Sequence, residues 1–234
     1  SRNKNLKQKL NLYKLAKLNQ FIKSYKSDIQ DFKKLSNVFK KVQPDICFHL
    51  AAQAQIKDCY DNPLETFKSN TLGVANILES VRLSNSLKAI VLISSDAVYK
   101  NLDTYYPYAE INRLGGKDPY SASKSAAELL TASYSKSYLD NKVSISTVRA
   151  GNVIGGGDWS SHRIINDAIY AWRKKKTLIV RNPHHIRPWQ HVLDPLHGYL
   201  KIAENQYLKK NFCKTYNFGP EVFETASVRN LIIE

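Results

Sequence analysis

Tyr120 and Lys124 are the two residues whose types and spacing point most directly to chemistry. Side chains four residues apart on a helix lie on the same face, one turn apart. A free tyrosine hydroxyl titrates near pH ~10, and a neighbouring ammonium lowers that pKa because it stabilises the phenolate. A hydroxyl from Ser94 or Ser95 could bond the same substrate alcohol. Together these groups predict a site that takes a proton from an alcohol while its hydride leaves to a nicotinamide.

The same spacing is also that of an amphipathic helix with one aromatic residue and one solvated lysine, so the surrounding elements decide its meaning. Apolar runs of strand length and helix length alternate along the chain, which predicts an α/β fold with a parallel sheet covered on both faces. The expected strands are residues 46–50, 89–93, 143–148, 178–180 and 216–218. The expected helices are residues 63–83, 120–139, 164–173 and 195–208.

Polar segments follow several of these predicted strands. Ligands of open parallel sheets bind outside the carboxyl ends of the strands. Residues 51–53, 94–96 and 149–152 should all lie at that edge. Their convergence with Tyr120 and Lys124 favours a ligand site over a solvated helix face.

The composition argues against several classes of protein. No apolar run approaches the ~20 residues that span a bilayer, and lysines interrupt the first apolar residues, unlike in a signal peptide. Cys47, Cys59 and Cys213 are odd in number and widely spaced, which fits neither a disulfide framework nor a metal site. We therefore expect reduced thiols in a cytoplasmic protein, with no metal and no membrane partner.

The net charge of +15 raises the question of nucleic-acid binding. Residues 1–45 hold twelve Lys and Arg against three Asp, so much of the excess lies in one segment. Its basic residues are mostly lysines scattered among Asn, Leu and Ser, with few arginines to read bases. A compositional bias explains this pattern more simply, and we expect no nucleic-acid partner.

Four segments carry a family resemblance: residues 48–53, 115–124, 149–159, and 181–183 together with 187–195. With Ser95 they make the chain resemble the extended short-chain dehydrogenases/reductases, over about residues 28–220. Within that superfamily the chain is most similar to the nucleotide-sugar 4,6-dehydratases of the CDP-glucose branch. The resemblance implies a Rossmann-like doubly wound parallel sheet with a smaller substrate-binding part.

The resemblance also implies a reaction and its catalytic residues. The reaction is the NAD-dependent dehydration of CDP-glucose to a 4-keto-6-deoxy sugar. Tyr120 would take the proton of the sugar's 4-hydroxyl, to which Ser95 would hydrogen-bond. Lys124 would support Tyr120 and bind the nicotinamide ribose, and Asp96 would act as the acid in water elimination.

Binding residues follow from the same resemblance. The expected NAD contacts are Asp28, Ile29, Leu50, Ala51, Ala52 and Asn70, together with Tyr120 and Lys124. The expected nucleotide-sugar contacts are Gln53, Asn152, Arg163 and Arg187, since a planar guanidinium suits phosphate oxygens. Residues 1–150, rejoined by about 192–220, would form the NAD-binding domain. Residues 151–191 and 221–234 would form the substrate-binding part, and the protein would be a homodimer.

Structural alternatives stay open for some of these residues. Asp28 could be a solvated loop carboxylate, Asn70 a helix-surface amide and Asp96 a helix cap. We expect His49, inside a buried strand, to be a core histidine rather than a catalyst. Gly155–Gly157 is expected to be a hinge of a substrate loop, because no Lys-Ser/Thr follows it as in a phosphate-binding loop.

Two features depart from the family pattern. Members carry a glutamate or, in the CDP-glucose branch, a lysine directly after the aspartate, whereas this chain has Ala97. The glycine-rich turn that holds the cofactor's pyrophosphate is absent, because the first glycine is Gly73. We expect a fragment, incomplete at both ends. An epimerase or reductase of the same fold, or a catalytically impaired sugar-nucleotide binding protein, stays open as an alternative.

Overall fold

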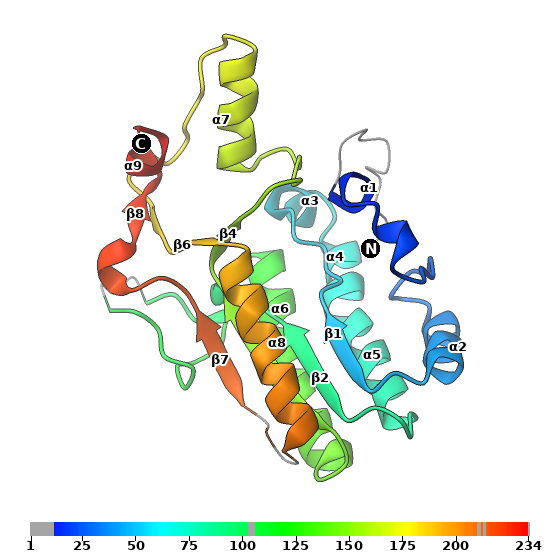
Figure 1. Ribbon diagram of the computed structural model, residues 1–234. Coiled ribbons are helices and arrows are strands. Elements are labelled where there is room, and N and C mark those ends of the chain that lie inside the picture. Colours follow the sequence, from blue (N-terminus) through cyan, green and yellow to red (C-terminus); the bar gives the residue numbers. More distant parts are fainter. Residues whose placement is uncertain (1–11, 103–105, 210–211, 213, 234) are drawn as a thin grey trace. The chain divides into compact units, whose positions relative to one another are not determined.

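The computed structural model describes residues 12–102, 106–209, 212 and 214–233 (Figure 1). The chain divides into two compact units. The first contains residues 25–150 and 195–218, and the second contains the described parts of residues 2–24, 151–194 and 219–234. Cys47 and Cys59 are free thiols, and Cys213 lies outside the described residues.

The first unit is built on a four-stranded sheet whose neighbouring strands are all parallel, in the order β1-β2-β3-β7. The strands are β1 (Ile46–His49), β2 (Ala89–Ile93), β3 (Ser144–Ala150) and β7 (Thr215–Phe218). Ala89 of β2 is paired with Ile46 on one side and with Ser144 on the other. No strand precedes β1 among the residues described from position 12 onward. The α/β fold class predicted from the apolar runs is confirmed.

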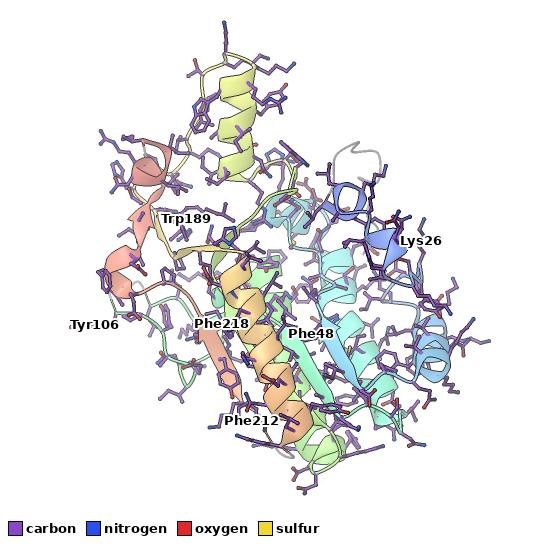
Figure 2. All side chains as sticks on the ribbon, in the orientation of Figure 1. Lys26, Phe48, Tyr106, Trp189, Phe212 and Phe218 are labelled. Atoms are coloured by element: carbon purple, nitrogen blue, oxygen red, sulfur yellow. The ribbon has the colours of Figure 1, made fainter. Side chains whose placement is uncertain are left out.

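Helices cover both faces of this sheet, which is why its strands are continuously apolar. Ile90 and Leu92 of β2 pack in one cluster with side chains of α2 (Phe32–Val42), α5 (Gly73–Arg82) and α6 (Pro119–Tyr134). Val91, pointing the other way, packs with Tyr199 and Ile202 of α8 (Leu193–Leu208). Phe48 and Phe218 join this second cluster and lie near α8 in Figure 2. A side chain at Gly198 of α8 would collide with the Phe218 ring, so only glycine permits this close approach.

Two of the predicted helices contain a wider π-helical turn. Residues 63–83 form α4 (Pro63–Phe67), the π turn η2 (Lys68–Leu72) and α5. Residues 120–139 form α6 and the π turn η4 (Ser135–Leu139). Such turns are often found at functional sites, and Asn70 lies inside η2.

The second unit contains two small sheets that the sequence analysis did not predict. Strand β4 (Asn152–Ile154) pairs in parallel with β6 (Trp189–His191), and β5 (Ile186–Arg187) pairs antiparallel with β8 (Ala226–Ser227). The helices are α1 (Leu12–Leu15), η1 (Leu18–Gln20), α7 (Ile164–Arg173), η5 (Val222–Glu224) and α9 (Val228–Ile233).

The strand expected at residues 178–180 is wrong. These residues pair with no strand, and Ile179 is 83% exposed, so the apolar run has no neighbour to satisfy a ladder. Residues 12–24 group with the second unit, whereas the sequence analysis placed them with residues 25–150; Leu12 lies against Gly157. Over the part of the chain that the structure describes, no helix is long and apolar enough to cross a membrane.

Candidate active site

The helix that carries Tyr120 and Lys124 begins at a strongly specified point. Asp118 caps α6 by accepting hydrogen bonds from the backbone N–H groups of Tyr120 and Ser121, at 2.9 and 3.1 Å. Ser121 Oγ bonds Asp118 in return, and Pro119 occupies the first turn, where its missing N–H costs nothing. A side chain at Gly116 would overlap the backbone at residues 121–122. These local contacts therefore fix where α6 begins, and with it the positions of Tyr120 and Lys124 along the helix.

Lys124 is buried, with 7% of its surface exposed, and it points at the carboxyl end of β2. Its Nζ donates to the carbonyl oxygen of Ile93 at 2.8 Å. Burial lowers the pKa of Lys124 to about 8, and the carboxylate of Glu128 opposes that shift. The side chain therefore remains largely protonated at neutral pH, as a cation held one helical turn from the half-buried Tyr120.

Ser95 and Asp96 directly follow the residue that receives the Lys124 hydrogen bond. Ser95 is buried, and its Oγ accepts from the N–H of Ala97 and donates to Asp96 Oδ1, both at 3.2 Å. Ser95 thus caps the short helix η3 (Asp96–Val98), the role considered for Asp96 as an alternative. Asp96 and Ala97 are exposed. A buried hydroxyl, an exposed carboxylate and a buried ammonium therefore gather at the end of one strand.

The residues expected along the cofactor path differ in their accessibility. Leu50, directly after β1, is 59% exposed, and Ala51 and Ala52 are partly exposed. Because β1 and β2 are parallel neighbours, these residues lie at the same sheet edge as Ser95. They can line a ligand without rearrangement.

Asp28, Ile29 and Asn70 are already engaged within the protein. Asp28 Oδ1 accepts from the N–H of Gln30, and the Ile29 side chain packs in the core. Asn70 is 1% exposed, so it is not a surface amide. Its amide bonds the backbone of Gln53 in both directions, at 2.7 and 3.0 Å, and donates to Ser123 Oγ. Asn70 therefore fixes the loop after β1 against α6.

His49 is buried at the end of β1 near Lys124. Burial, assisted by the Lys124 charge, lowers the pKa of His49 to about 3. Unfolding restores a pKa near 6.5, so the stability that neutral His49 contributes is present above pH 6.5 and is lost as the pH falls toward 3. Between pH 6.5 and 4.5 we expect the unfolding free energy of wild type to fall by about 2 kcal/mol more than that of His49→Gln. Urea unfolding at both pH values measures this difference. An equal fall of unfolding free energy in the two proteins would contradict the prediction.

The residues expected to hold the nucleotide sugar fall in both units. Gln53 belongs to the first unit, with its backbone bonded to Asn70. Asn152 lies in β4, Arg163 precedes α7 as its N-cap, and Arg187 lies in β5, all in the second unit. Arg163 and Arg187 are exposed, and Arg187 bonds His185 Nδ1 at 3.3 Å. Their roles in substrate binding stay predictions.

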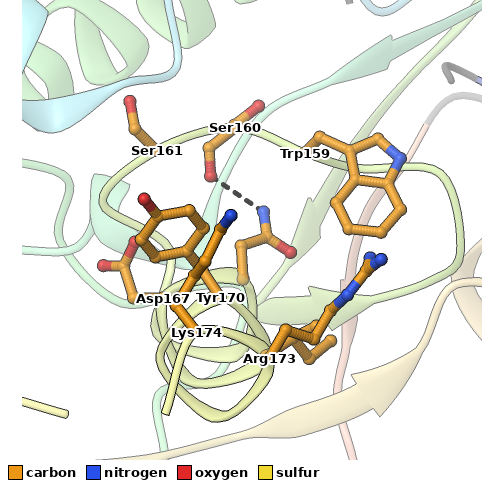
Figure 3. Close-up of a pocket in the computed structure, with 9 residues that line it drawn as sticks. Trp159, Ser160, Ser161, Asp167, Tyr170, Arg173 and Lys174 are labelled. Atoms are coloured by element: carbon orange, nitrogen blue, oxygen red, sulfur yellow. Dashed lines mark hydrogen bonds between the residues drawn. The ribbon is translucent and has the colours of Figure 1, made fainter. Parts of the chain in front are cut away.

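The second unit also contains a hollow of about 590 Å³ (Figure 3). Trp159, Tyr170, Arg173 and Lys174 line it, and Asn166 donates to the carbonyl of Ser160 beside it. Two cations and two aromatic rings suit an anionic ring-bearing group. None of the predicted site residues lines this hollow. Tyr170 and Lys174 repeat the four-residue spacing of Tyr120 and Lys124, but both are exposed, whereas Lys124 is buried and bonds the Ile93 carbonyl. The acid–base chemistry therefore stays a prediction for the first unit.

One buried cluster was missed by the sequence analysis. Glu128, one turn beyond Lys124, forms a bidentate ion pair with Arg149 of β3, and Ser94 Oγ donates to the same carboxylate. Two signals in the sequence could have revealed it. Glu128 continues the four-residue spacing of Tyr120 and Lys124, and Arg149 is a charged residue near the end of a buried strand.

The end of β2 has side chains that fit part of a nicotinamide cofactor. The buried cation of Lys124, the polar end of β2 and the exposed Leu50 fit the ribose and ring of a nicotinamide nucleotide. No glycine-rich turn for its pyrophosphate occurs in the sequence, whose first glycine is Gly73. Among the described residues, no group of three or more His, Cys, Asp or Glu side chains is arranged to hold a metal ion.

Comparisons with known proteins show which family this chain resembles in sequence. The family model described as GDP-mannose 4,6 dehydratase matches residues 1–229. The CDP-glucose 4,6-dehydratase of Salmonella typhimurium is 39% identical over 228 residues, which cover 94% of this chain and 64% of that protein. The UDP-glucose 4-epimerase of Mycoplasma genitalium is 33% identical over 217 residues, or 85% of this chain and 62% of that protein.

A solved structure shows the same fold. The dTDP-glucose 4,6-dehydratase of Bacillus anthracis, solved in complex with NAD, superposes with a TM-score of 0.79 at 21% sequence identity. The match covers 95% of this chain and 66% of that one. The chain thus spans somewhat less than two thirds of the length of both curated relatives.

Proposed function

Because this chain belongs to the GDP-mannose 4,6 dehydratase family, we propose that its protein dehydrates a nucleotide-activated hexose, CDP-glucose, to the 4-keto-6-deoxy sugar. The 39% identity to a CDP-glucose 4,6-dehydratase supports this choice of substrate. The observation that carries the proposal is the Lys124 ammonium bonded to the Ile93 carbonyl. It holds the cation of the tyrosine–lysine pair beside Ser95, the hydroxyl that the chemistry requires.

The residues of this chain divide the work of proton transfer. Tyr120, as the phenolate that the charge of Lys124 stabilises, removes the proton of the sugar's 4-hydroxyl and becomes the neutral phenol. Ser95 Oγ hydrogen-bonds the same sugar oxygen. Asp96, which is exposed and next in sequence, protonates the hydroxyl that leaves from carbon 6. Tyr120 and Ser95 thus act at the sugar's 4-oxygen, and Asp96 acts at the oxygen on carbon 6.

We propose NAD as the cofactor. The chemistry that bound NAD supplies to such a reaction is the acceptance and later return of one hydride. Lys124 and Tyr120 would hold its nicotinamide ribose, and Leu50, Ala51 and Ala52 would line its path. Asn70 would act on that path through the Gln53 backbone that it holds, and Asp28 and Ile29 would lie at the adenine.

We also propose Gln53, Asn152, Arg163 and Arg187 as contacts of the nucleotide sugar. The guanidinium groups of Arg163 and Arg187 are exposed, so they can pair with diphosphate oxygens without leaving a buried partner. Asn152 and Gln53 would add amide contacts to the nucleotide sugar. Single substitutions of either arginine by methionine should raise KM for CDP-glucose more than they lower kcat.

The decisive assay uses the complete protein with CDP-glucose and NAD+. Formation of the 4-keto-6-deoxy product, detected by its absorbance in alkali, is the expected result. No product at any enzyme concentration would overturn the proposal. NMR of the recovered sugar separates dehydration from its alternative, because only dehydration removes the 6-hydroxyl.

One observation favours a second candidate, epimerisation of a nucleotide sugar. Ala97 cannot transfer a proton, and in members of this family the residue after the aspartate is ionisable. The UDP-glucose 4-epimerase of Mycoplasma genitalium is also a relative, although it is less similar than the dehydratase. An epimerised product that retains its 6-hydroxyl would establish this candidate.

The exposure of Ala97 makes a gain-of-function test possible. Its side chain faces outward from η3, so a lysine fits there without displacing core residues. We expect Ala97→Lys to raise the rate of water elimination by roughly 10- to 100-fold, since a positioned acid or base typically contributes ~100-fold or more. Alanine-to-lysine substitution at the exposed Ala109 is the matched control. An unchanged elimination rate would show that Ala97 does not limit this step.

We also propose a cytoplasmic homodimer without nucleic-acid or membrane partners. Leu64 and Phe67 of α4 and Leu129 of α6 are exposed apolar residues on two helices that pack together. Ala127, Leu130 and Tyr134 instead pack in the core. Sedimentation of wild type and Leu129→Glu tests the dimer, since a charge at a buried interface should dissociate it.

A further inference from the structure

The buried pair Glu128–Arg149 occupies the centre of a hydrogen-bond network behind the candidate active site. Both side chains are almost inaccessible, at 6% and 4% exposure. Arg149 Nε donates to both Glu128 oxygens, at 2.9 and 3.1 Å, and its NH2 group completes the bidentate contact. Burying two charges is costly, so a buried pair is weak support for stability alone. The hydrogen bonds of the pair point instead to a role in positioning its neighbours.

The network grips both ends of one short segment. At the first end, Ser94 Oγ donates to Glu128 Oε1. At the other end, Arg149 NH1 donates to Tyr99 Oη at 2.7 Å, and the guanidinium lies 4.7 Å from the Tyr99 ring centre. Ser95 and Asp96 lie between these two points.

The far end of the network is anchored in turn. Tyr99 Oη donates to Asn217 of β7 at 2.6 Å, and its ring stacks on Tyr108 at 4.9 Å. Arg149 NH1 also donates to the carbonyl of Glu110, whose carboxylate accepts from the Asn217 N–H. The segment from Ser94 to Tyr99 is thus tied to β3, β7 and α6 at once.

The same carboxylate also faces the catalytic lysine. Glu128 and Lys124 line one small cavity of about 20 Å³. The other residues that line it are His49 of β1, Leu92 and Ile93 of β2, Ser94 directly after β2, Val74 of α5, Ala127 and Thr131 of α6, and Thr147 of β3. Among these described groups, Glu128 carries the negative charge, and its own partner Arg149 lies beyond it.

We propose that Glu128 and Arg149 are positioning residues: their ion pair holds the segment 94–99 at both ends, and Glu128 keeps Lys124 charged. The inference deepens the proposed function and rests on it for the roles of Ser95 and Lys124. In its absence the segment would move relative to α6, and a shift of about 1 Å is enough to lower a rate ~100-fold.

The electrostatic half is tested without turnover, by the pH dependence of unfolding. Relative to Lys124→Met, wild-type stability should rise with pH from about 8, where the folded pKa of Lys124 lies, because the unfolded chain still binds the proton. Glu128→Gln removes the opposing charge, so the rise should begin about one pH unit lower. His49, with its pKa near 3, does not titrate in this range. A purely structural role would lower stability equally at every pH, and an unmoved onset overturns this half.

The positional half is tested by kinetics of the complete protein. Ser94→Ala and Tyr99→Phe each delete one tie and leave the ion pair intact, so both should fold even if Glu128→Gln does not. We expect each to lower kcat about tenfold or more with KM nearly unchanged. Ser80→Ala, at a buried serine whose hydroxyl bonds a backbone carbonyl, and Tyr199→Phe are controls outside the network. A kcat equal to that of wild type in both Ser94→Ala and Tyr99→Phe overturns the positional half of the proposal.

The unfolding and kinetic experiments distinguish failure of this inference from failure of the proposed function. If wild type forms no 4-keto-6-deoxy sugar, the proposed function fails, and the onset of the alkaline rise still decides whether Glu128 sets the charge of Lys124. If wild type is active and the tie variants match it, only the positioning role fails.

Discussion

Tyr120→Phe is expected to lower kcat for CDP-glucose dehydration at least ~1,000-fold in the complete protein. The substitution deletes the phenolate oxygen that accepts the sugar's 4-proton, and positioned acid–base groups contribute ~100- to 10,000-fold. Folding should be preserved, because the Asp118 cap and the close approach at Gly116 fix the start of α6. The measurement is the initial rate of product formation at saturating substrate.

The control for this variant is Tyr138→Phe, which removes an exposed hydroxyl from η4, the turn that continues α6. Its kcat should equal that of wild type. Affinity of Tyr120→Phe for CDP-glucose, measured by calorimetry, should change less than tenfold. A kcat within tenfold of wild type would show that Tyr120 is not the base.

Lys124→Met is expected to lose activity and, at the same time, a pH dependence of stability. Activity should fall ~100- to 10,000-fold, because the phenolate loses its neighbouring cation. Burial lowers the pKa of Lys124 from 10.5 to about 8. Few single substitutions would change chemistry and titration together, so the pair of results is diagnostic.

The sign of the titration effect follows from where the proton is bound. Between pH 8 and 10.5 the unfolded chain keeps a proton on Lys124 that the folded protein has released. The contribution of Lys124 to the free energy of unfolding therefore rises with pH through this window, by up to ~1.4 kcal/mol per unit. Lys124→Met has no such group, so its free energy of unfolding should rise correspondingly less between pH 8 and 10.

Urea denaturation at pH 8, 9 and 10 measures this difference. Lys142→Met is the matched control, because Lys142 also donates to a backbone carbonyl, that of Arg82 at 2.9 Å, but is exposed. In the control, the free energy of unfolding should change with pH as it does in wild type. The same change with pH in all three proteins would mean that Lys124 titrates normally and is accessible to water in the native state.

The sequence predicted well those features that depend on short stretches of chain. The strands β1, β2, β3 and β7 were located because burial on both faces demands continuous apolar runs. The start of α6 was predicted within one residue, since Asp118 and Pro119 specify a helix start locally. Residues 178–180 form the same kind of run and were predicted wrongly, because strand formation also requires a partner.

Features that depend on distant partners could not be predicted. The π turn η2 presents Asn70 to the backbone of Gln53 and to Ser123, and no local pattern announces those contacts. Asn70 and Ile29 were expected at the cofactor, yet their side chains are engaged within the protein. Their proximity to the cofactor stays a prediction.

By itself, then, the sequence determined the α/β class, the parallel sheet and the pairing of Tyr120 with Lys124, since periodicity and helical spacing are local properties. The tertiary structure alone decided what surrounds that pair. Lys124 became a buried cation with a lowered pKa because β2 delivers the Ile93 carbonyl to it. Glu128 met Arg149 because β3 lies beside β2, under α6. Desolvation and charge pairing act through space, so they exist only once the chain has folded.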